Sequence, residues 1–295
     1  MAKIAVALKD AVEQRATNGA PGRVAQRILA QGKGWSVADV VCTHGPHDRS
    51  YEEQHYAYLI AIVVAGSFQY RGSRRRELMT PGSFVLGGYG QSFECGHEHH
   101  MGDRCLAFSF SPDYFQQVAA DTGNARAEFP TLRLPPMRAF SHLAARACAG
   151  LMEPGGVPWE EIGLQLAGDT MQFVKSGDLS FSQDGAPLSS EARVTRVLRM
   201  IERHICDGLD VKIENLALEA GLSPYHFLRT FERVTGTSPH QYIVRMRLRE
   251  AAIRLVAEPE RILDIALDCG FGDVSNFNRA FRAEFAMSPR AYRKA

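Results

Sequence analysis

The chain has 295 residues, 45% of them hydrophobic, and a formal net charge of +1. This length is typical of about two domains, and the apolar content is sufficient for buried cores. The net charge close to zero means that the chain as a whole is not strongly basic. The sequence contains no stretch of about 18 apolar residues that could form a membrane helix.

The charge is unevenly distributed along the chain. From residue 191 onward there are 17 Lys and Arg against 14 Asp and Glu, a net of +3, which leaves 17 against 19, a net of −2, before it. The six cysteines are scattered without a Cys-x-x-Cys pair, and the N-terminal apolar run is too short for a signal peptide. We therefore expect a cytoplasmic protein with reduced thiols and a weakly basic C-terminal part.

The first third of the chain is expected to be rich in strands. Residues 1–34 are mixed and predict a loosely held arm with a short helix at 24–30. After that come short β-rich runs broken by Gly and Pro. The expected strands are 36–43, 57–70, 75–79, 83–87 and 105–110. Many short antiparallel strands predict a small barrel or jelly roll whose interior can hold a small ligand.

The densest polar cluster of this region reads Cys-Gly-His-Glu-His-His from residue 95. On a strand, residues two apart share a face, so Cys95, His97 and His99 would form a set of ligands of the kind that zinc or another transition metal uses. With Cys105, these are the candidate effector or metal residues. A polar loop at the barrel mouth and a thiol switch between Cys95 and Cys105 are the other interpretations.

The pattern becomes helical after residue 110. Ser111 and Pro112 suit the cap and first position of a helix that runs to Val118. Apolar spacing predicts two longer helices at 139–152 and 158–174. This helical pair is a candidate dimer interface, and packing on its own barrel is the alternative.

Residues 176–190 are rich in Gly, Ser, Asp and Pro and predict a linker. Ser190 is the expected N-cap of the helix that follows. The outward side of that helix is basic, which indicates either a phosphate contact or a solvated face; its arginines are Arg193, Arg196, Arg199 and Arg203.

The stretch from residue 215 to 242 recurs near the C-terminus about 49 residues later. A repeat of this length is one packed unit used twice, here a short helix, a turn through Gly and a second helix. Phe227 and Phe231 lie four apart on one helical face, and so do Phe277 and Phe281. The opposite faces are polar, as a surface that contacts base edges and phosphates would be.

With this repeat, the C-terminal third of the chain resembles the DNA-binding domain of the AraC family of bacterial transcriptional regulators. The motifs that carry the resemblance are Leu216-Ala217-x-x-Ala220-Gly221-x-Ser223, Phe227-x-Arg229-x-Phe231, Gly236-x-Ser238-Pro239-x-x-Tyr242, Ile265-Ala266-x-x-x-Gly270-Phe271, Arg279-x-Phe281 and Ser288-Pro289-x-x-Tyr292-Arg293. The first half is similar in outline to the cupin-like sensor domains of that family.

The resemblance implies seven helices, two helix-turn-helix units joined by a long helix at about 239–256, and a recognition helix of each unit in the major groove of double-stranded DNA. By position in the motif, the implied DNA-contacting residues are Tyr225, His226, Arg229, Val274, Ser275, Asn278 and Arg279. It also implies a homodimer, a small-molecule effector and, for an activator, RNA polymerase as a partner.

The predicted fold class is therefore α+β with two domains: an N-terminal cupin-like β-barrel with a helical hairpin, and a C-terminal all-α domain with two helix-turn-helix units. The expected boundaries are an arm at 1–34, a sensor and dimerisation domain at 35–175, a linker at 176–190 and a DNA-binding domain at 191–295.

The expected function is sequence-specific DNA binding by a transcriptional regulator that responds to a small molecule in the barrel. Alternatives are a metal- or thiol-responsive regulator that uses the Cys95 cluster, and a cupin-type metalloenzyme fused to a DNA-binding domain. No Glu follows the His-x-His motif at the spacing of cupin enzymes, and no Ser-His-Asp arrangement, P-loop or dinucleotide fingerprint occurs. We therefore expect no catalytic residue, no membrane association and no cofactor, with a metal ion at the Cys95 cluster as the alternative.

Overall fold

The computed structural model describes residues 2–73, 75–98, 102–151, 156–176, 187–205 and 212–294. The chain divides into two compact units. We call them the β unit, Ala5–Pro135 with Gly156–Ala186, and the helical unit, Met1–Ile4 with Pro136–Gly155 and Pro187–Ala295. None of the helices in the described part of the chain combines the length and apolarity needed to span a membrane.

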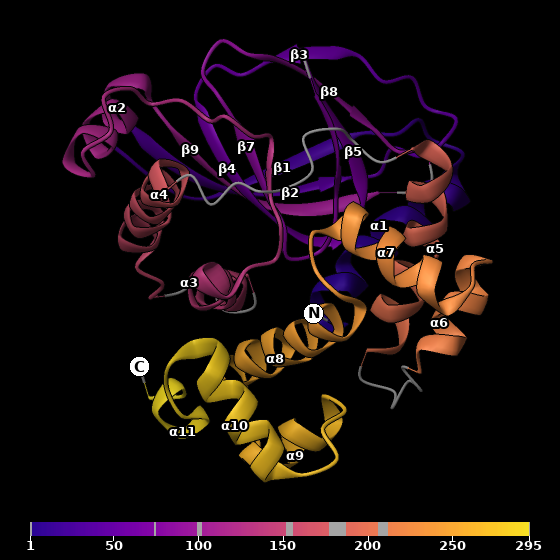
Figure 1. The fold of residues 1–295 in the computed structure, drawn as a ribbon. Coiled ribbons are helices and arrows are strands. Elements are labelled where there is room, and N and C mark those ends of the chain that lie inside the picture. Colours follow the sequence, from indigo (N-terminus) through magenta and orange to yellow (C-terminus); the bar gives the residue numbers. More distant parts are fainter. Residues whose placement is uncertain are drawn as a thin grey trace. The chain divides into compact units, whose positions relative to one another are not determined.

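The β unit contains two antiparallel sheets (Figure 1). The six-stranded sheet has the order β1 (Val24–Gly32), β2 (Trp35–Cys42), β9 (Asp103–Phe110), β4 (Tyr58–Gly66), β7 (Phe84–Gly87) and β10 (Arg133–Leu134). The four-stranded sheet has the order β3 (Glu52–Gln54), β8 (Ser92–Gly96), β5 (Phe68–Gly72) and β6 (Arg76–Met79). This pair of sheets confirms the predicted jelly-roll-like architecture.

Both faces of the six-stranded sheet are buried at its centre. On the inner face, Ala61 and Val63 of β4 pack with Phe68 and Tyr70 of the other sheet in one buried cluster. On the outer face, Phe108 of β9 lies under α4 (Trp159–Ser176), which approaches closely through Gly163. This two-sided burial explains why β4 reads as a continuous apolar run instead of an alternating one.

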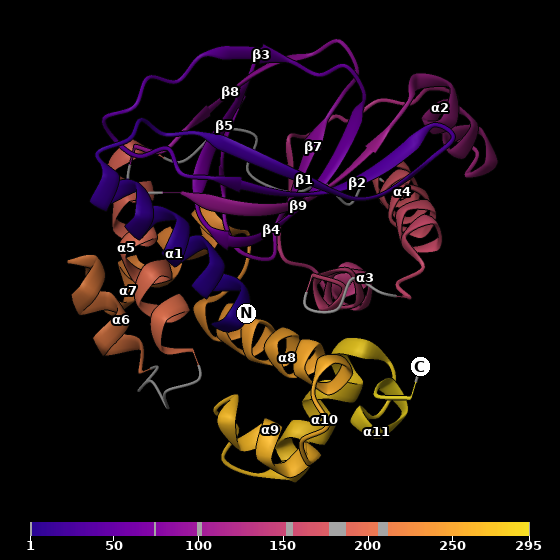
Figure 2. The ribbon, with the colours of Figure 1, turned by 180° about the vertical axis from the view of Figure 1, so that it is seen from behind.

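Helices of the β unit lie against this sheet. α2 (Pro112–Asp121) and α4 lie side by side, and α4 contacts β1 and β2 (Figure 1, Figure 2). The predicted N-terminus of α2 is confirmed, because the Tyr114 N–H donates to the Ser111 side chain.

The prediction for the first 34 residues was wrong. Residues 24–32 form the strand β1, because they pair with β2 along almost their whole length, with one register shift between Ile28 and Ala30. Residues 2–18 form the helix α1 (Ala2–Asn18), which is held by the buried Leu8 and by an ion pair of 2.7 Å between Arg15 and Asp48. The predicted strand 57–70 is also two strands, β4 and β5, separated at Gly66 (φ 74°).

The helical unit contains α3 (Arg138–Ala149), α5 (Leu188–His204), α6 (Ile213–Ala220), α7 (Pro224–Thr235), α8 (Pro239–Ala257), α9 (Ile262–Asp268), α10 (Val274–Phe285) and α11 (Pro289–Tyr292). The described part from α5 onward thus has the seven helices that the resemblance implies, and α8 is the long connecting helix. The helix α5 begins at Leu188 after Pro187, so the prediction of Ser190 as its N-cap was wrong.

The expected helical hairpin is divided between the two units. α3 groups with the helical unit, whereas α4 groups with the β unit. Ala145 of α3 is fully buried in the core cluster that contains Leu248 and Phe281, and the ring of His142 meets that of Tyr292 edge-on at 5.4 Å. Most of the predicted linker lies outside the described residues.

Candidate nucleic-acid interface and sensor cavity

A cavity of about 390 Å³ lies in the β unit, and its lining comes from both sheets and from the loop after β2. Its apolar lining includes Ala61, Phe68 and Val85. This volume is in the range of pockets that bind small molecules.

One polar pair in the cavity is His55 with Tyr70. The His55 ring nitrogen and the Tyr70 hydroxyl share a hydrogen bond, and Phe93 stacks on the imidazole with ring centroids 4.1 Å apart. Burial lowers the pKa of His55 to about 4 and raises the pKa of Tyr70. The pair is therefore neutral at physiological pH and can offer hydrogen bonds without charge.

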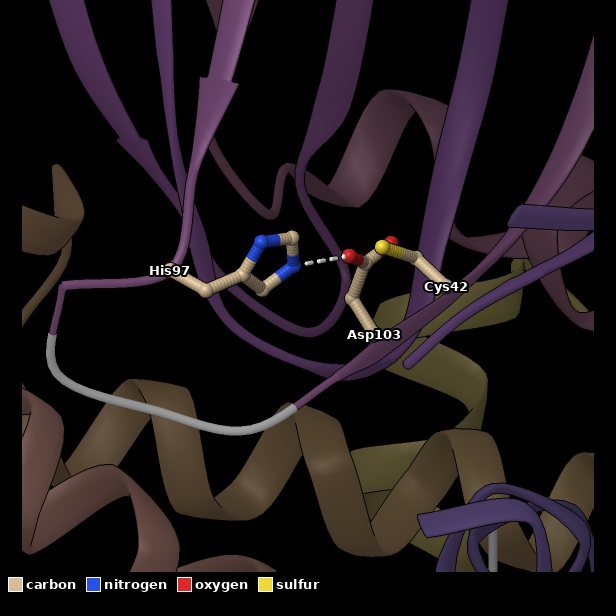
Figure 3. Close-up of side chains that lie close together, drawn as sticks. All are labelled: Cys42, His97 and Asp103. Atoms are coloured by element: carbon tan, nitrogen blue, oxygen red, sulfur yellow. Dashed lines mark hydrogen bonds and ion pairs between the residues drawn. The ribbon is translucent and has the colours of Figure 1, made fainter. Parts of the chain in front are cut away.

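A second polar group consists of Cys42, His97 and Asp103, which come from three different segments (Figure 3). Cys42 ends β2, Asp103 begins β9 opposite it, and His97 directly follows β8. His97 Nε2 lies 2.6 Å from Asp103 Oδ1, and one ligand atom from each of the three residues lies within 4.8 Å of the others. All three residues are buried and line the cavity.

The position of Asp103 depends on a close approach between the backbone at Gly66 and the backbone at Gly102 and Asp103. At Gly66 (φ +74°) a Cβ atom would lie 2.4 Å from the carbonyl oxygen of Gly102 and 2.9 Å from the Cα of Asp103. Only glycine fits such a contact at a positive φ. The bend at the end of β4 therefore lets the start of β9 reach the cavity.

Three of the four predicted effector or metal residues line the cavity. Cys95, His97 and Cys105 line the same cavity, whereas His99 lies outside the described residues. The strand β8 ends at Gly96, so the alternation that placed residues 95, 97 and 99 on one face does not extend through the motif. Sequence reasoning missed Cys42, whose only signal is its register opposite Asp103.

The surroundings of the cavity thiols favour the protonated form over the reactive thiolate. Burial, followed by the nearby Asp103 carboxylate, raises the pKa of Cys42 to about 12. The same two causes raise the pKa of Cys95 and of Cys105. Protonated buried thiols are poor nucleophiles, which disfavours the alternative of a thiol switch between Cys95 and Cys105.

The first helix-turn-helix of the helical unit consists of α6 and α7. Gly221 ends α6 in the left-handed conformation (φ 64°), and the His226 N–H donates to the side chain of Ser223, which caps α7. Phe227 and Phe231 are completely buried. The turn and the aromatic face thus fix α7 with its other side outward.

The second helix-turn-helix repeats this construction with α9 and α10. Gly270 has φ +80°, and the Asn276 N–H donates to the side chain of Asp273, which caps α10. Phe277 and Phe281 are completely buried in a cluster of aromatic and aliphatic side chains from α3 and from α8 to α11. The twofold use of one packing unit, predicted from the repeat, is confirmed.

The residues implied to contact DNA lie on the outer sides of α7 and α10. Tyr225 is 67% exposed, and His226 and Arg229 are also exposed. In the second unit Ser275 and Arg279 are exposed, whereas Val274 and Asn278 are half-buried.

Two of these side chains have local partners. The His226 Nδ1 lies 2.8 Å from the Ser223 hydroxyl, and Arg279 Nη2 donates to Asn276 Oδ1 at 3.1 Å. These contacts restrict the orientation of the His226 imidazole and of the Arg279 guanidinium.

The arginines on the basic side of α5 (Leu188–His204) differ in their surroundings. Arg193 donates to the carbonyl oxygens of Ala220 (3.0 Å) and Gly221 (2.8 Å), and so stabilises the C-terminus of α6. Arg196 and Arg203 are exposed. Part of the predicted basic face is therefore structural.

Similar proteins agree with this architecture. Residues 216–295 match the family model for a helix-turn-helix domain. The transcriptional activator NphR of Rhodococcus sp is 29% identical over 258 residues, 80% of this chain and 70% of that protein. The HTH-type transcriptional activator RhaS of Klebsiella pneumoniae (strain 342) is 35% identical over 106 residues, 36% of this chain and 37% of that protein.

A solved structure also aligns with part of the chain. It is a transcriptional regulator with an AraC-type DNA-binding domain from Chromobacterium violaceum, 28% identical, covering 37% of this chain and 95% of that chain with a TM-score of 0.33. The two helix-turn-helix units and the relatives that match them show a DNA-binding transcriptional regulator whose C-terminal end is a DNA-binding domain of the AraC type.

Proposed function

We propose that this regulator binds a small-molecule effector in the cavity of the β unit and that binding changes its activity on DNA. The cavity itself carries this proposal, since it is about 390 Å³ in volume and combines an apolar lining with the buried His55–Tyr70 pair. An effector of mixed character, with an aromatic or aliphatic body and one or two neutral hydrogen-bonding groups, matches that lining.

For DNA recognition, the proposal assigns the contacts to Tyr225, His226 and Arg229 of α7 and to Val274, Ser275, Asn278 and Arg279 of α10. The exposure of the two arginines supports base readout, because a guanidinium can donate two hydrogen bonds to guanine in the major groove. Ser275 and Asn278 suit bases or phosphates, whereas Val274 offers only an apolar contact, for example to a thymine methyl.

The names of two relatives favour activation over repression, since NphR and RhaS are both called transcriptional activators. An activator needs a surface for RNA polymerase, so we include the polymerase as a partner and the bacterial cytoplasm as the place of action. A homodimer completes the proposal, and light scattering of the full chain tests it. These relatives also favour a regulator without catalytic activity.

The experiment begins with genome-wide mapping of the DNA that the full chain binds, which yields the specific site and the target genes. Small molecules suggested by those genes are then screened for thermal stabilisation of the chain and for a change in affinity for that site. A true effector should do both.

A cavity-filling variant locates the binding site of any hit. Ala107 lines the cavity, so Ala107→Leu should reduce the affinity for the effector at least about tenfold. The matched control is Ala120→Leu on the exposed side of α2, which should bind as the parent chain does. Equal effector affinity in both variants would refute the cavity as the sensor site.

A further inference from the structure

The group of Cys42, His97 and Asp103 has the composition of a metal site. It offers one sulfur, one imidazole nitrogen and one carboxylate oxygen, all within 4.8 Å of one another. Zinc and similar divalent transition metals bind this mixture of donors, usually with four ligands in a tetrahedron. Calcium and magnesium prefer oxygen ligands alone and do not suit a site with sulfur and nitrogen.

The spacing of the ligand atoms is close to what such an ion requires. Metal–ligand bonds of about 2.0–2.3 Å at tetrahedral angles separate the ligand atoms by about 3.3–3.7 Å. His97 Nε2 and Asp103 Oδ1 are 2.6 Å apart because they share a hydrogen bond. An ion that replaces this shared proton and the proton of the Cys42 thiol would need the His97 nitrogen and the Asp103 oxygen to move apart by less than about 1 Å, which side-chain rotation can supply.

The surroundings provide support around these ligands. The Cys105 thiol donates to the other oxygen of the Asp103 carboxylate, at 3.4 Å. His44 Nδ1 lies 3.2 Å from the Cys42 sulfur, and its ring stacks on that of His97 with centroids 6.2 Å apart. Such neighbours orient metal ligands and are part of built metal sites.

We infer that Cys42, His97 and Asp103 bind a divalent transition-metal ion of the zinc type inside the β unit, with a fourth position left for His44 or for a ligand in the cavity. All four residues line the same cavity. This metal site would add to the proposed function, and its regulatory role rests on that function, because it requires this cavity to be the effector site. The metal ion either anchors the effector or is itself the signal.

Cobalt(II) and zinc(II) salts alone are the probes, applied to the full chain after removal of bound metal. Cobalt should bind with one equivalent and produce the thiolate-to-cobalt charge-transfer absorption and the visible bands of a four-coordinate site. Cys42→Ser should lose the charge-transfer absorption, and Asp103→Asn should weaken zinc binding at least about tenfold.

Cys95→Ser is the matched control, because Cys95 lines the same cavity but is not one of the three clustered ligands. It should keep the full cobalt spectrum. Circular dichroism of each variant separates loss of the site from loss of folding. A parent chain without cobalt bands overturns the inference and leaves His97 and Asp103 as a buried hydrogen-bonded pair. Equal loss of the spectrum in Cys95→Ser also overturns the assignment.

The affinity for the mapped DNA site is measured on the same samples. Specific DNA binding without any cobalt bands would overturn the metal site and leave the regulator function intact. A cobalt spectrum in a chain that fails to bind specific DNA would support the metal site and refute the proposed regulator function.

Discussion

Replacement of Arg229 by Ala should weaken binding to the specific DNA site far more than binding to random DNA. Arg229 is exposed, and among the described residues its guanidinium has no hydrogen bond or ion pair. Its removal therefore breaks no described hydrogen bond or ion pair of the fold, and we expect the main effect on DNA binding. A bidentate arginine–guanine contact contributes about 1–3 kcal/mol of discrimination, which corresponds to a loss of roughly 5- to 150-fold in specificity.

Fluorescence anisotropy with the mapped site and with random duplexes of equal length, over a series of salt concentrations, measures both affinities. Arg196→Ala on α5 is the matched control, because it removes the same exposed charge away from the recognition helices. If Arg229→Ala reduces both affinities equally and lowers the salt slope by about one, Arg229 is a phosphate contact and the assignment of base readout is refuted.

Three further predictions concern stability. Burial lowers the pKa of His55 from 6.5 to about 4, so between these pH values the unfolded chain binds more protons than the folded chain. The free energy of unfolding should therefore fall as the pH drops from about 6.5 to 4, by at most about 3 kcal/mol. Denaturant titrations at several pH values should show this dependence, and His55→Asn should remove most of it. Gly66→Ala should destabilise the chain by roughly 2 kcal/mol or more, because its Cβ would lie 2.4 Å from a carbonyl oxygen, whereas Gly90→Ala, with a similar positive φ and nothing within 4 Å, should cost about 1 kcal/mol in the same titrations. Phe281→Ala should cost about 3–5 kcal/mol by thermal or chemical denaturation, and Leu218→Ala, 79% exposed, less than about 0.5.

Local patterns were enough to predict the helix-turn-helix units. The turn glycines and the paired phenylalanines each act within a few residues, so their effect can be read from the sequence. Gly221 and Gly270 have the positive φ that a tight turn between helices needs, and Ser223 caps α7.

Features that depend on distant partners could not be predicted in this way. β1 looks helical alone and becomes a strand only because β2 pairs with it. The meeting of Cys42 with Asp103 requires the register of β2 and β9, which no spacing within the sequence contains. Similarly, α3 precedes α4 in the chain, yet its Ala145 completes the core of the helical unit.

Net charge is a poor guide to DNA binding in this chain for a structural reason. Arg254 is bound to the carboxylates of Glu258 (2.8 Å) and Asp268 (3.0 Å), and Arg193 is bound to backbone carbonyls at the end of α6. The charge of Arg254 is therefore balanced by carboxylates, and the guanidinium of Arg193 is engaged with the backbone at the end of α6. Arg229 and Arg279 are exposed, and neither has an ion pair among the described residues. The net charge of +3 from residue 191 onward counts all these arginines equally. The electrostatics of DNA binding therefore follow from which arginines the fold leaves without a carboxylate or backbone partner, and not from the total.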